Sequence, residues 1–436
     1  MTLDLLRFTT AGSVDDGKST LIGRLLYDSK QVFDDQLEHV ALASERRGGE
    51  GTLDLALLTD GLRAEREQGI TIDVAYRYFA TAKRRFIIAD CPGHHQYTRN
   101  MVTGASTADV SVVLLDARRG VLEQSKRHAF ISALLGIPHM IVAINKMDLV
   151  GYSQERFEEL VGEFEGFAAK LSRGPGRLSA GSEHASPRPE MTYIPISALN
   201  GDNVVERSEL MPWYDGPVLL DWLEQVDVAY DHPYDRPARF PVQWVIRPSN
   251  GALGSEYRGY SGQLASGALR RGEEVAVLPG GGRTRIAAID TYDGELEEAM
   301  APMSLTLRLE DELDVSRGEL ICRPEEAPVV AQELEADICW MDEKPLRAGS
   351  RYLVKHTSRS AVAVVDEIGE IVDVHTLERD APPLELALND IARVRLRTSA
   401  PLVFDPYTSN RRTGSFILID ESSNRTVGAG MITDAS

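Results

Sequence analysis

The chain contains 436 residues, 43% of them hydrophobic, and its 47 Lys and Arg against 67 Asp and Glu give a formal net charge of −20. At about 150 residues per domain this length predicts roughly three domains, and the composition excludes a mainly disordered chain. The acidic balance argues against non-specific binding of nucleic acid, and the 3 scattered cysteines exclude a disulfide framework and fit a reducing compartment.

The N-terminal half of the chain has the pattern of an α/β domain. Its first ten residues carry Asp4 and Arg7 where a signal peptide would be apolar. No apolar run approaches the roughly 18 residues of a membrane span, so we expect a cytoplasmic protein without a membrane partner. From residue 6 to about residue 224, short apolar runs alternate with helical patterns. This alternation is typical of a mostly parallel sheet with helices on both faces.

Three apolar runs in this half read as buried strands of a parallel sheet. They cover residues 86–89, 110–115 and 140–144, and each ends in a polar or glycine-rich segment. One stretch differs, because residues 72–81 and 85–89 flank a short turn and have the pattern of a hairpin. We therefore expect one antiparallel strand in an otherwise parallel sheet.

The rest of the chain predicts β-structure. After residues 231–237, short β-type runs alternate with Gly, Pro and Asp and show little helical periodicity. We expect a first domain over residues 1–230, followed by two antiparallel β-barrels over residues 236–325 and 329–436. Residues 172–190 are rich in Gly, Pro and Ser and predict a flexible loop inserted in the first domain, to which we assign no function.

A phosphate-binding loop is predicted between the first strand and the first helix. The pattern G-x-x-x-x-G-K-[ST], extended by one residue, occupies Gly12, Ser13, Val14, Asp15, Asp16, Gly17, Lys18, Ser19 and Thr20. The two glycines let backbone N–H groups approach an anion, and the N-terminus of the following helix adds its positive dipole end. Lys18 supplies a charge for the β- and γ-phosphates, and Ser19 a hydroxyl ligand for Mg²⁺. The alternative is a glycine turn with an incidental lysine.

Three further segments follow apolar strands, and parallel strands bring the loops at their carboxyl ends to one edge of the sheet. They comprise Asp90, Cys91, Pro92, Gly93 and His94; Asn145, Lys146, Met147 and Asp148; and Ser197, Ala198 and Leu199. Asp90 is expected on the metal side, and the Gly93 amide on the γ-phosphate. The Asp148 carboxylate can accept two hydrogen bonds from guanine that adenine cannot offer, and the third segment can present an N–H to the guanine carbonyl.

Two residues are candidates for metal binding and for catalysis near the γ-phosphate. Thr71 lies before the hairpin and can complete the Mg²⁺ octahedron only when a γ-phosphate is present. A strand-opening threonine is the alternative. His94 can orient the attacking water, whereas a purely structural histidine is the alternative. A carboxylate as close to phosphates as Asp15 is expected to cap an N–H group or to hold a cation.

Taken together, these motifs resemble the translation-factor class of GTPases, of which elongation factor Tu is a familiar member. That class usually carries His at the position of Asp16. Residues 12–28, with the sequence GSVDDGKSTLIGRLLYD, are more similar to the GTPase subunits of bacterial ATP sulfurylase. Residues 60–76 and 405–432 carry the same resemblance, and departures occur at residues 172–190 and at Cys91, where that family more often has Thr.

The resemblance implies a specific activity and a specific partner. It implies a GTPase that binds GTP and Mg²⁺ and uses Lys18, Thr71 and His94 in catalysis. GTP hydrolysis would support the formation of adenosine 5′-phosphosulfate and pyrophosphate from ATP and sulfate. It also implies a small catalytic subunit of the ATP-pyrophosphatase type, in a heterodimer or higher assembly that serves sulfate assimilation and cysteine biosynthesis. The alternatives are a translation-factor-like GTPase that delivers aminoacyl-tRNA and a nodulation-type paralogue of the same subunit.

Overall fold

The computed structural model describes residues 4–30, 55–58, 74–93, 98–171, 189–228, 235–247, 257–373 and 376–435. The chain divides into two compact units. One unit comprises Met1–Arg177, Ser186–Val228 and Asp373–Glu378, and the other comprises Leu178–Ala185, Ala229–Val372 and Arg379–Ser436. The three domain boundaries expected from the sequence stay predictions, and most of the expected loop at residues 172–190 lies outside the described residues.

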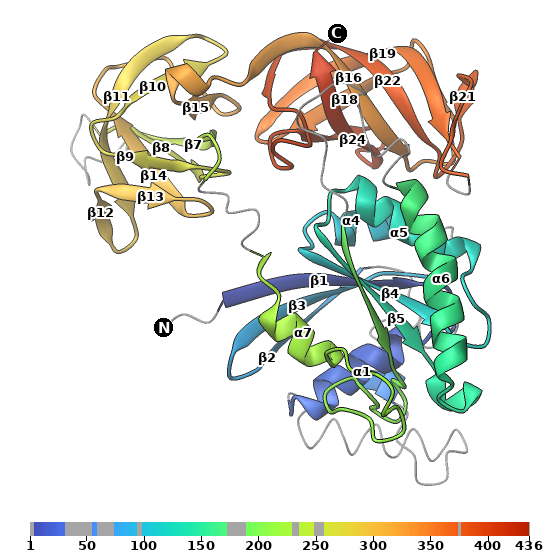
Figure 1. Cartoon of the computed structure of the whole chain (residues 1–436). Helices are drawn as coiled ribbons and strands as arrows, with labels where there is room; N and C mark the ends of the chain where they lie inside the picture. Colours follow the sequence, from blue (N-terminus) through green and yellow to red (C-terminus); the bar gives the residue numbers. More distant parts are fainter. Residues whose placement is uncertain are drawn as a thin grey trace. The chain divides into compact units, whose positions relative to one another are not determined.

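The first unit contains a mixed sheet with the strand order β2-β3-β1-β4-β5-β6 (Figure 1). Its strands are β1 (Asp4–Gly12), β2 (Ala75–Ala80), β3 (Arg84–Asp90), β4 (Val110–Asp116), β5 (His139–Asn145) and β6 (Glu190–Pro195). Neighbouring strands run parallel except β2, which pairs antiparallel with β3 as the hairpin pattern predicted. Every residue of β4 and β5 is buried, which explains why their sequences are mainly apolar.

Helices cover both faces of this sheet, so the α/β fold class is confirmed (Figure 1). The helices are α1 (Lys18–Asp28), α4 (Thr98–Ala105), α5 (Glu123–Leu134), α6 (Gln154–Leu171) and α7 (Leu219–Gln225), with short 3-10 turns at Leu55–Leu58 and Met147–Val150. Helices α4, α5 and α6 lie on one side of the sheet, and α1 and α7 lie on the other. None of the helices in the described ranges combines the length and apolar character needed to cross a bilayer.

An aromatic cluster anchors the antiparallel edge of the sheet. The rings of Phe79 and Phe86 stack with centroids 4.5 Å apart, and Phe8 meets each of them edge-on at 6.4 Å. All three side chains are buried, and they come from β2, β3 and β1. Edge-to-face and stacked aromatic pairs each add about 0.5–1.5 kcal/mol beyond their buried area. This cluster therefore holds the hairpin on the strand that leads to the phosphate-binding loop.

The second unit contains the two expected antiparallel β-barrels. In the first, β10-β15-β7-β8-β14-β11 form a ring closed by the β10–β11 pair; in the second, β18-β23-β24-β16-β22-β19 form a ring closed by the β18–β19 pair. The strands of the first barrel and its flanking pieces are β7 (Phe240–Ile246), β8 (Gly259–Gln263), β9 (Ala268–Arg270), β10 (Glu274–Leu278), β11 (Gly282–Thr291), β12 (Gly294–Leu296), β13 (Glu298–Met300), β14 (Ser304–Leu309) and β15 (Leu320–Cys322). Those of the second are β16 (Val329–Trp340), β17 (Leu346–Arg347), β18 (Arg351–His356), β19 (Arg359–Val372), β20 (Arg379–Asp380), β21 (Glu385–Leu386), β22 (Ile391–Phe404), β23 (Ser415–Ile419) and β24 (Thr426–Ala435). Outside the two rings, β13 pairs with β9 and β17 pairs with β21 in separate two-stranded sheets.

A buried polar cluster joins these two barrels within their unit. The guanidinium of Arg239, which is 3% exposed, donates two hydrogen bonds to the carboxylate of Asp405 at 2.9 and 2.8 Å. Thr413 donates to the same carboxylate at 2.5 Å, and the Asn410 amide donates to the Ser266 hydroxyl at 2.9 Å. Asp405 and Asn410 belong to the C-terminal segment that resembled the ATP sulfurylase GTPases, and here they contact the preceding barrel.

Candidate nucleotide-binding site

The predicted phosphate-binding loop lies between β1, which ends at Gly12, and α1, which begins at Lys18. Gly12 has φ +142° and Gly17 has φ +96°, backbone conformations that other residues rarely adopt. A Cβ atom on Gly17 would lie 2.4 Å from the side-chain nitrogen of Asn145, and one on Gly12 would lie 2.8 Å from the Leu114 carbonyl oxygen. Both glycines are therefore required by the close approach of neighbouring strands to the loop.

Lys18 is the cation at the centre of this loop. Its side chain is 7% exposed, and its ammonium donates to the carbonyl oxygens of Gly12 at 3.1 Å and Ser13 at 2.8 Å. Burial lowers the pKa of this lysine, while Asp16 and then Asp90 oppose the shift. A Cβ atom on Gly93 would lie 2.4 Å from the ammonium nitrogen, so the loop after β3 packs directly on Lys18.

Asp90, at the end of β3, is 2% exposed and accepts a hydrogen bond from the Thr10 hydroxyl at 3.2 Å. Cys91 is completely buried and lies 3.1 Å from the Thr9 hydroxyl. Burial raises the pKa of its thiol to about 12, so the thiol stays protonated and unreactive. The predicted roles of His94 and Thr71 concern positions outside the described residues.

Asn145 ties three of the predicted loops together. Its amide nitrogen donates to the Asp16 carbonyl oxygen at 2.8 Å, and its amide oxygen accepts from the Ala198 N–H at 2.9 Å. The Asp148 carboxylate accepts from the Ser197 hydroxyl at 2.8 Å, which orients it at the end of the β5 loop. The Met147 side chain is buried beneath the loop after β5, whereas the Leu199 side chain is half exposed. The expected convergence of the strand-end loops is thus present.

Lys146 connects the loop after β5 to the phosphate-binding loop, and a buried carboxylate holds its ammonium. Its ammonium donates to Asp116 at 2.9 Å and also to the Asp15 carbonyl oxygen, and Arg118 donates to Asp116 at 2.7 Å. Burial raises the pKa of the Asp116 carboxyl, but the hydrogen bonds from Arg118 and Lys146 outweigh it and hold the pKa below its usual range. The sequence analysis missed Asp116 and Arg118, although both directly follow the apolar run of β4.

His128, on α5, is a second residue that the sequence analysis missed. Its Nδ1 atom accepts a hydrogen bond from the Gly12 N–H at 2.9 Å, and its Nε2 atom lies 2.9 Å from the side-chain amide of Gln124. The imidazole is completely buried, and this burial lowers its pKa to about 3. A neutral ring therefore holds the first glycine of the loop. The only signal in the sequence is the i, i+4 spacing of Gln124 and His128 on one helix face.

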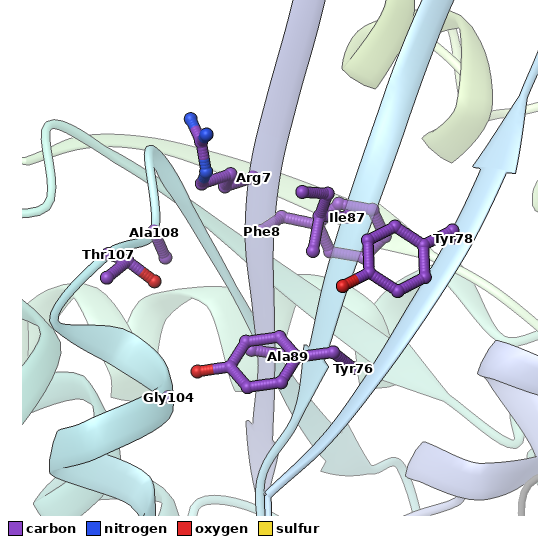
Figure 2. A pocket seen from close by; sticks show the side chains of 9 residues that line it. All are labelled: Arg7, Phe8, Tyr76, Tyr78, Ile87, Ala89, Gly104, Thr107 and Ala108. Atoms are coloured by element: carbon purple, nitrogen blue, oxygen red, sulfur yellow. The ribbon is translucent and has the colours of Figure 1, made fainter. Parts of the chain in front are cut away.

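A cavity of about 280 Å³ lies elsewhere on the first unit (Figure 2). It is lined by Arg7, Phe8, Tyr76, Tyr78, Ile87, Ala89, Gly104, Thr107 and Ala108. Figure 2 shows the two tyrosines on the β2 side of the cavity and Thr107 and Ala108 on the opposite side. None of the predicted nucleotide-contacting residues lines it, so it is separate from the strand-end loops.

Comparisons with known proteins agree with this geometry. Residues 3–229 match the elongation factor Tu GTP binding domain, and residues 333–433 match the GTP-eEF1A C-terminal domain-like family. Sulfate adenylyltransferase subunit 1 of Bacteroides fragilis is 51% identical over 99% of this chain and 86% of its own length. The chain belongs to the sulfate adenylyltransferase subunit 1 family. Within that family, the protein of Shewanella oneidensis is 52% identical over 98% of this chain and 85% of its own length.

A related fused protein gives a similar match. The bifunctional enzyme CysN/CysC of Mycobacterium tuberculosis is 55% identical over 98% of this chain, which spans 67% of that protein's length. Membership of the family confirms the resemblance seen in the sequence, and the matched GTP binding domain makes this chain a GTPase of that family. The departure at Cys91 is therefore compatible with membership, and its side chain is completely buried.

Proposed function

We propose that this chain hydrolyses GTP at the strand-end loops and thereby supports synthesis of adenosine 5′-phosphosulfate and pyrophosphate from ATP and sulfate on a partner subunit. The observation that carries the proposal is the contact between the loops, in which Lys18 meets Gly93 and Asn145 meets both Asp16 and Ala198. The family of relatives named sulfate adenylyltransferase subunit 1 supplies the reaction.

The phosphate end of the site is proposed to work through charge and backbone amides. Lys18 is bound to the carbonyl oxygens of Gly12 and Ser13, and it would exchange these for phosphate oxygens when the triphosphate enters. The amides of the loop, including those of Val14, Gly17 and Thr20, would add donors that require no reorganisation during the reaction. Hydrolysis is expected to pass through a loose in-line transition state whose charge these groups stabilise.

The residues on the metal side fit Mg²⁺. Ser19 lies on the first turn of α1, and the Asp90 carboxylate is oriented by Thr10; hydroxyl and carboxylate oxygens are the ligands that Mg²⁺ prefers. The ion would neutralise charge that develops on the phosphates. We propose Thr71 as a further ligand and His94 as the residue that orients the attacking water, both on the sequence motifs alone.

The base end is proposed to select guanine. Asp148 would accept hydrogen bonds from N1–H and the 2-amino group, while Asn145 holds the loop in register with the phosphate-binding loop. The segment of Ser197, Ala198 and Leu199 would present a backbone N–H to the guanine carbonyl, and the hydrogen bond from Ala198 to Asn145 holds this segment beside the β5 loop. Adenine offers neither donor to Asp148, which separates GTP from the ATP used by the partner.

The partner is proposed to be a small catalytic subunit of the ATP-pyrophosphatase type, in a heterodimer or larger assembly. The reason is that the sequence holds one phosphate-loop motif, so ATP and sulfate require another active site. The phosphosulfate anhydride forms at an energetic disadvantage, and hydrolysis of a second nucleotide can drive it. With this partner, the protein would act in cytoplasmic sulfate assimilation and cysteine biosynthesis.

Co-purification with the partner tests this function. The complex should release pyrophosphate from ATP only when sulfate is present, and GTP should accelerate that release. The Lys18→Ala variant in the same complex is the control, because it removes the cation for the triphosphate and leaves the partner unchanged. A rate that is equal with and without GTP would contradict the proposal, and GTP hydrolysis stimulated by ribosomes would favour the translation-factor alternative.

A further inference from the structure

Asp16 carries a buried carboxylate inside the phosphate-binding loop. Asp16 is 1% exposed, and its Oδ2 atom accepts a hydrogen bond from the Ser13 N–H at 2.6 Å. Its Oδ1 atom is buried and has no hydrogen-bond partner among the described residues. A buried carboxylate with an unsatisfied oxygen is energetically costly, so its presence in a tight loop requires an explanation.

A neighbouring carboxylate shows how the same domain handles a buried charge elsewhere. Asp116 is also 1% exposed, but Lys146 and Arg118 bind it at 2.9 and 2.7 Å. Asp16 forms no ion pair with any lysine or arginine in the part of the chain that the structure describes. Burial is the largest influence on the Asp16 carboxyl and raises its pKa. Asp116 thus has direct ion-pair partners, whereas Lys18 and Lys146 act on the Asp16 carboxyl only through space and lower its pKa.

Ser13 links this carboxylate to the phosphate-binding lysine. The Ser13 N–H donates to Asp16, and the Ser13 carbonyl oxygen accepts from the Lys18 ammonium at 2.8 Å. After burial, Asp16 is the strongest influence on Lys18, and it favours the charged lysine. The carboxylate therefore opposes the effect of burial on the Lys18 pKa, but its charge also offsets part of the positive field that attracts phosphates.

We propose that Asp16 is a positioning residue whose buried negative charge weakens the hold of the loop on the nucleotide phosphates and so speeds nucleotide release. This inference rests on the proposed GTP site. The hydrogen bond to Ser13 shapes the loop, while the charge repels the phosphates that the loop binds. Because the carboxylate is buried, bulk salt screens this repulsion only weakly.

Dissociation of a guanine nucleotide with a fluorescent ribose label tests the proposal. Asp16→Asn and Asp16→Ser each keep an oxygen that can accept from the Ser13 N–H, and each removes the charge. We expect GDP to dissociate about tenfold more slowly from both variants, since one unit charge at this range is worth a factor of that order. The effect should be larger for GTP than for GDP and absent for guanosine, because it scales with the number of phosphates.

Two controls separate charge from structure. Asp109→Asn makes the same chemical change at a carboxylate that accepts from the Arg7 N–H at 2.9 Å in the same domain, and it should leave dissociation unchanged. The melting temperature of each nucleotide-free variant shows whether it folds. Unchanged or faster dissociation from both Asp16 variants, or loss of folding in both, would overturn the proposal. Failure of the wild-type chain to bind GTP would instead overturn the proposed site.

Discussion

Asp148 is the residue on which base selection is expected to depend. Its carboxylate is oriented by the Ser197 hydroxyl at 2.8 Å. Replacing it by Asn converts one acceptor oxygen into an N–H donor. This donor would face the 2-amino donor of guanine, whereas the 2-carbonyl oxygen of xanthine can accept from it. We expect Asp148→Asn to lose GTP affinity by on the order of 10²–10⁴-fold and to prefer xanthosine triphosphate. Competition between the two nucleotides measures this, and a variant that still prefers GTP would exclude Asp148 from the base site.

Lys18 is expected to dominate triphosphate affinity. Its buried ammonium already binds the carbonyl oxygens of Gly12 and Ser13 at the centre of the loop. We expect Lys18→Ala to weaken GTP binding by about 10²-fold or more, since charge-assisted hydrogen bonds contribute about 1.5–3 kcal/mol each.

The matched control for Lys18 is Lys83→Ala. The Lys83 side chain is 62% exposed and pairs with Glu224 on the surface of the same domain. Displacement of a labelled nucleotide should give an unchanged affinity for this control. Equal affinities for the Lys18 and Lys83 variants would contradict the role of Lys18.

At the scale of elements, α5 holds the phosphate-binding loop through His128, and this contact predicts a pH dependence of stability. The folded pKa is about 3 because of burial, whereas an unfolded histidine titrates near 6.5. Below about pH 6.5 this histidine binds a proton in the unfolded chain but not in the folded chain. The free energy of unfolding therefore falls as the pH drops from 6.5 toward 3. His128→Asn keeps an acceptor for Gly12 and cannot titrate. Its free energy of unfolding should fall less steeply between pH 6.5 and 4, and an identical slope would contradict the assignment.

The link between the barrels also predicts a measurable cost. Asp405→Asn would leave the buried Arg239 without its charge partner and should destabilise the second unit by about 3–5 kcal/mol. The control is Asp366→Asn, which breaks the exposed Asp366–Arg397 pair and should cost less than about 1 kcal/mol. Denaturant unfolding of the full chain compares the two, and equal effects would show that the buried pair contributes no more than a surface one.

The elements that the sequence predicted well are those whose signal is local. The buried strands β4 and β5 were visible as unbroken apolar runs, and the loop between Gly12 and Lys18 as a motif between a strand and a helix. His128 and Asp116 were missed because their roles depend on contacts with residues far away in the chain, such as Gly12 for His128. The unpaired oxygen of Asp16 was hidden for the same reason, since burial is decided by packing rather than by the motif.

At the scale of the whole molecule, the family assignment and the loop geometry converge on a GTPase. The sequence motifs predicted GTP as the nucleotide, and the contacts through Asn145 explain how loops from separate strands can act as one site. Nucleotide-dependent affinity for a partner would require the reciprocal effect, in which the partner changes the affinity for GTP by the same factor. The partner is titrated into the protein with and without GTP, and GTP is titrated with and without the partner. The two ratios of affinities should be equal.

Calorimetric titration of the chain with GTP in the presence of Mg²⁺ tests the central claim most directly. The account predicts saturable heat with one GTP per chain, and no comparable heat from ATP at the same concentrations. Absence of heat from GTP with well-folded protein, or equal binding of ATP and GTP, would contradict it.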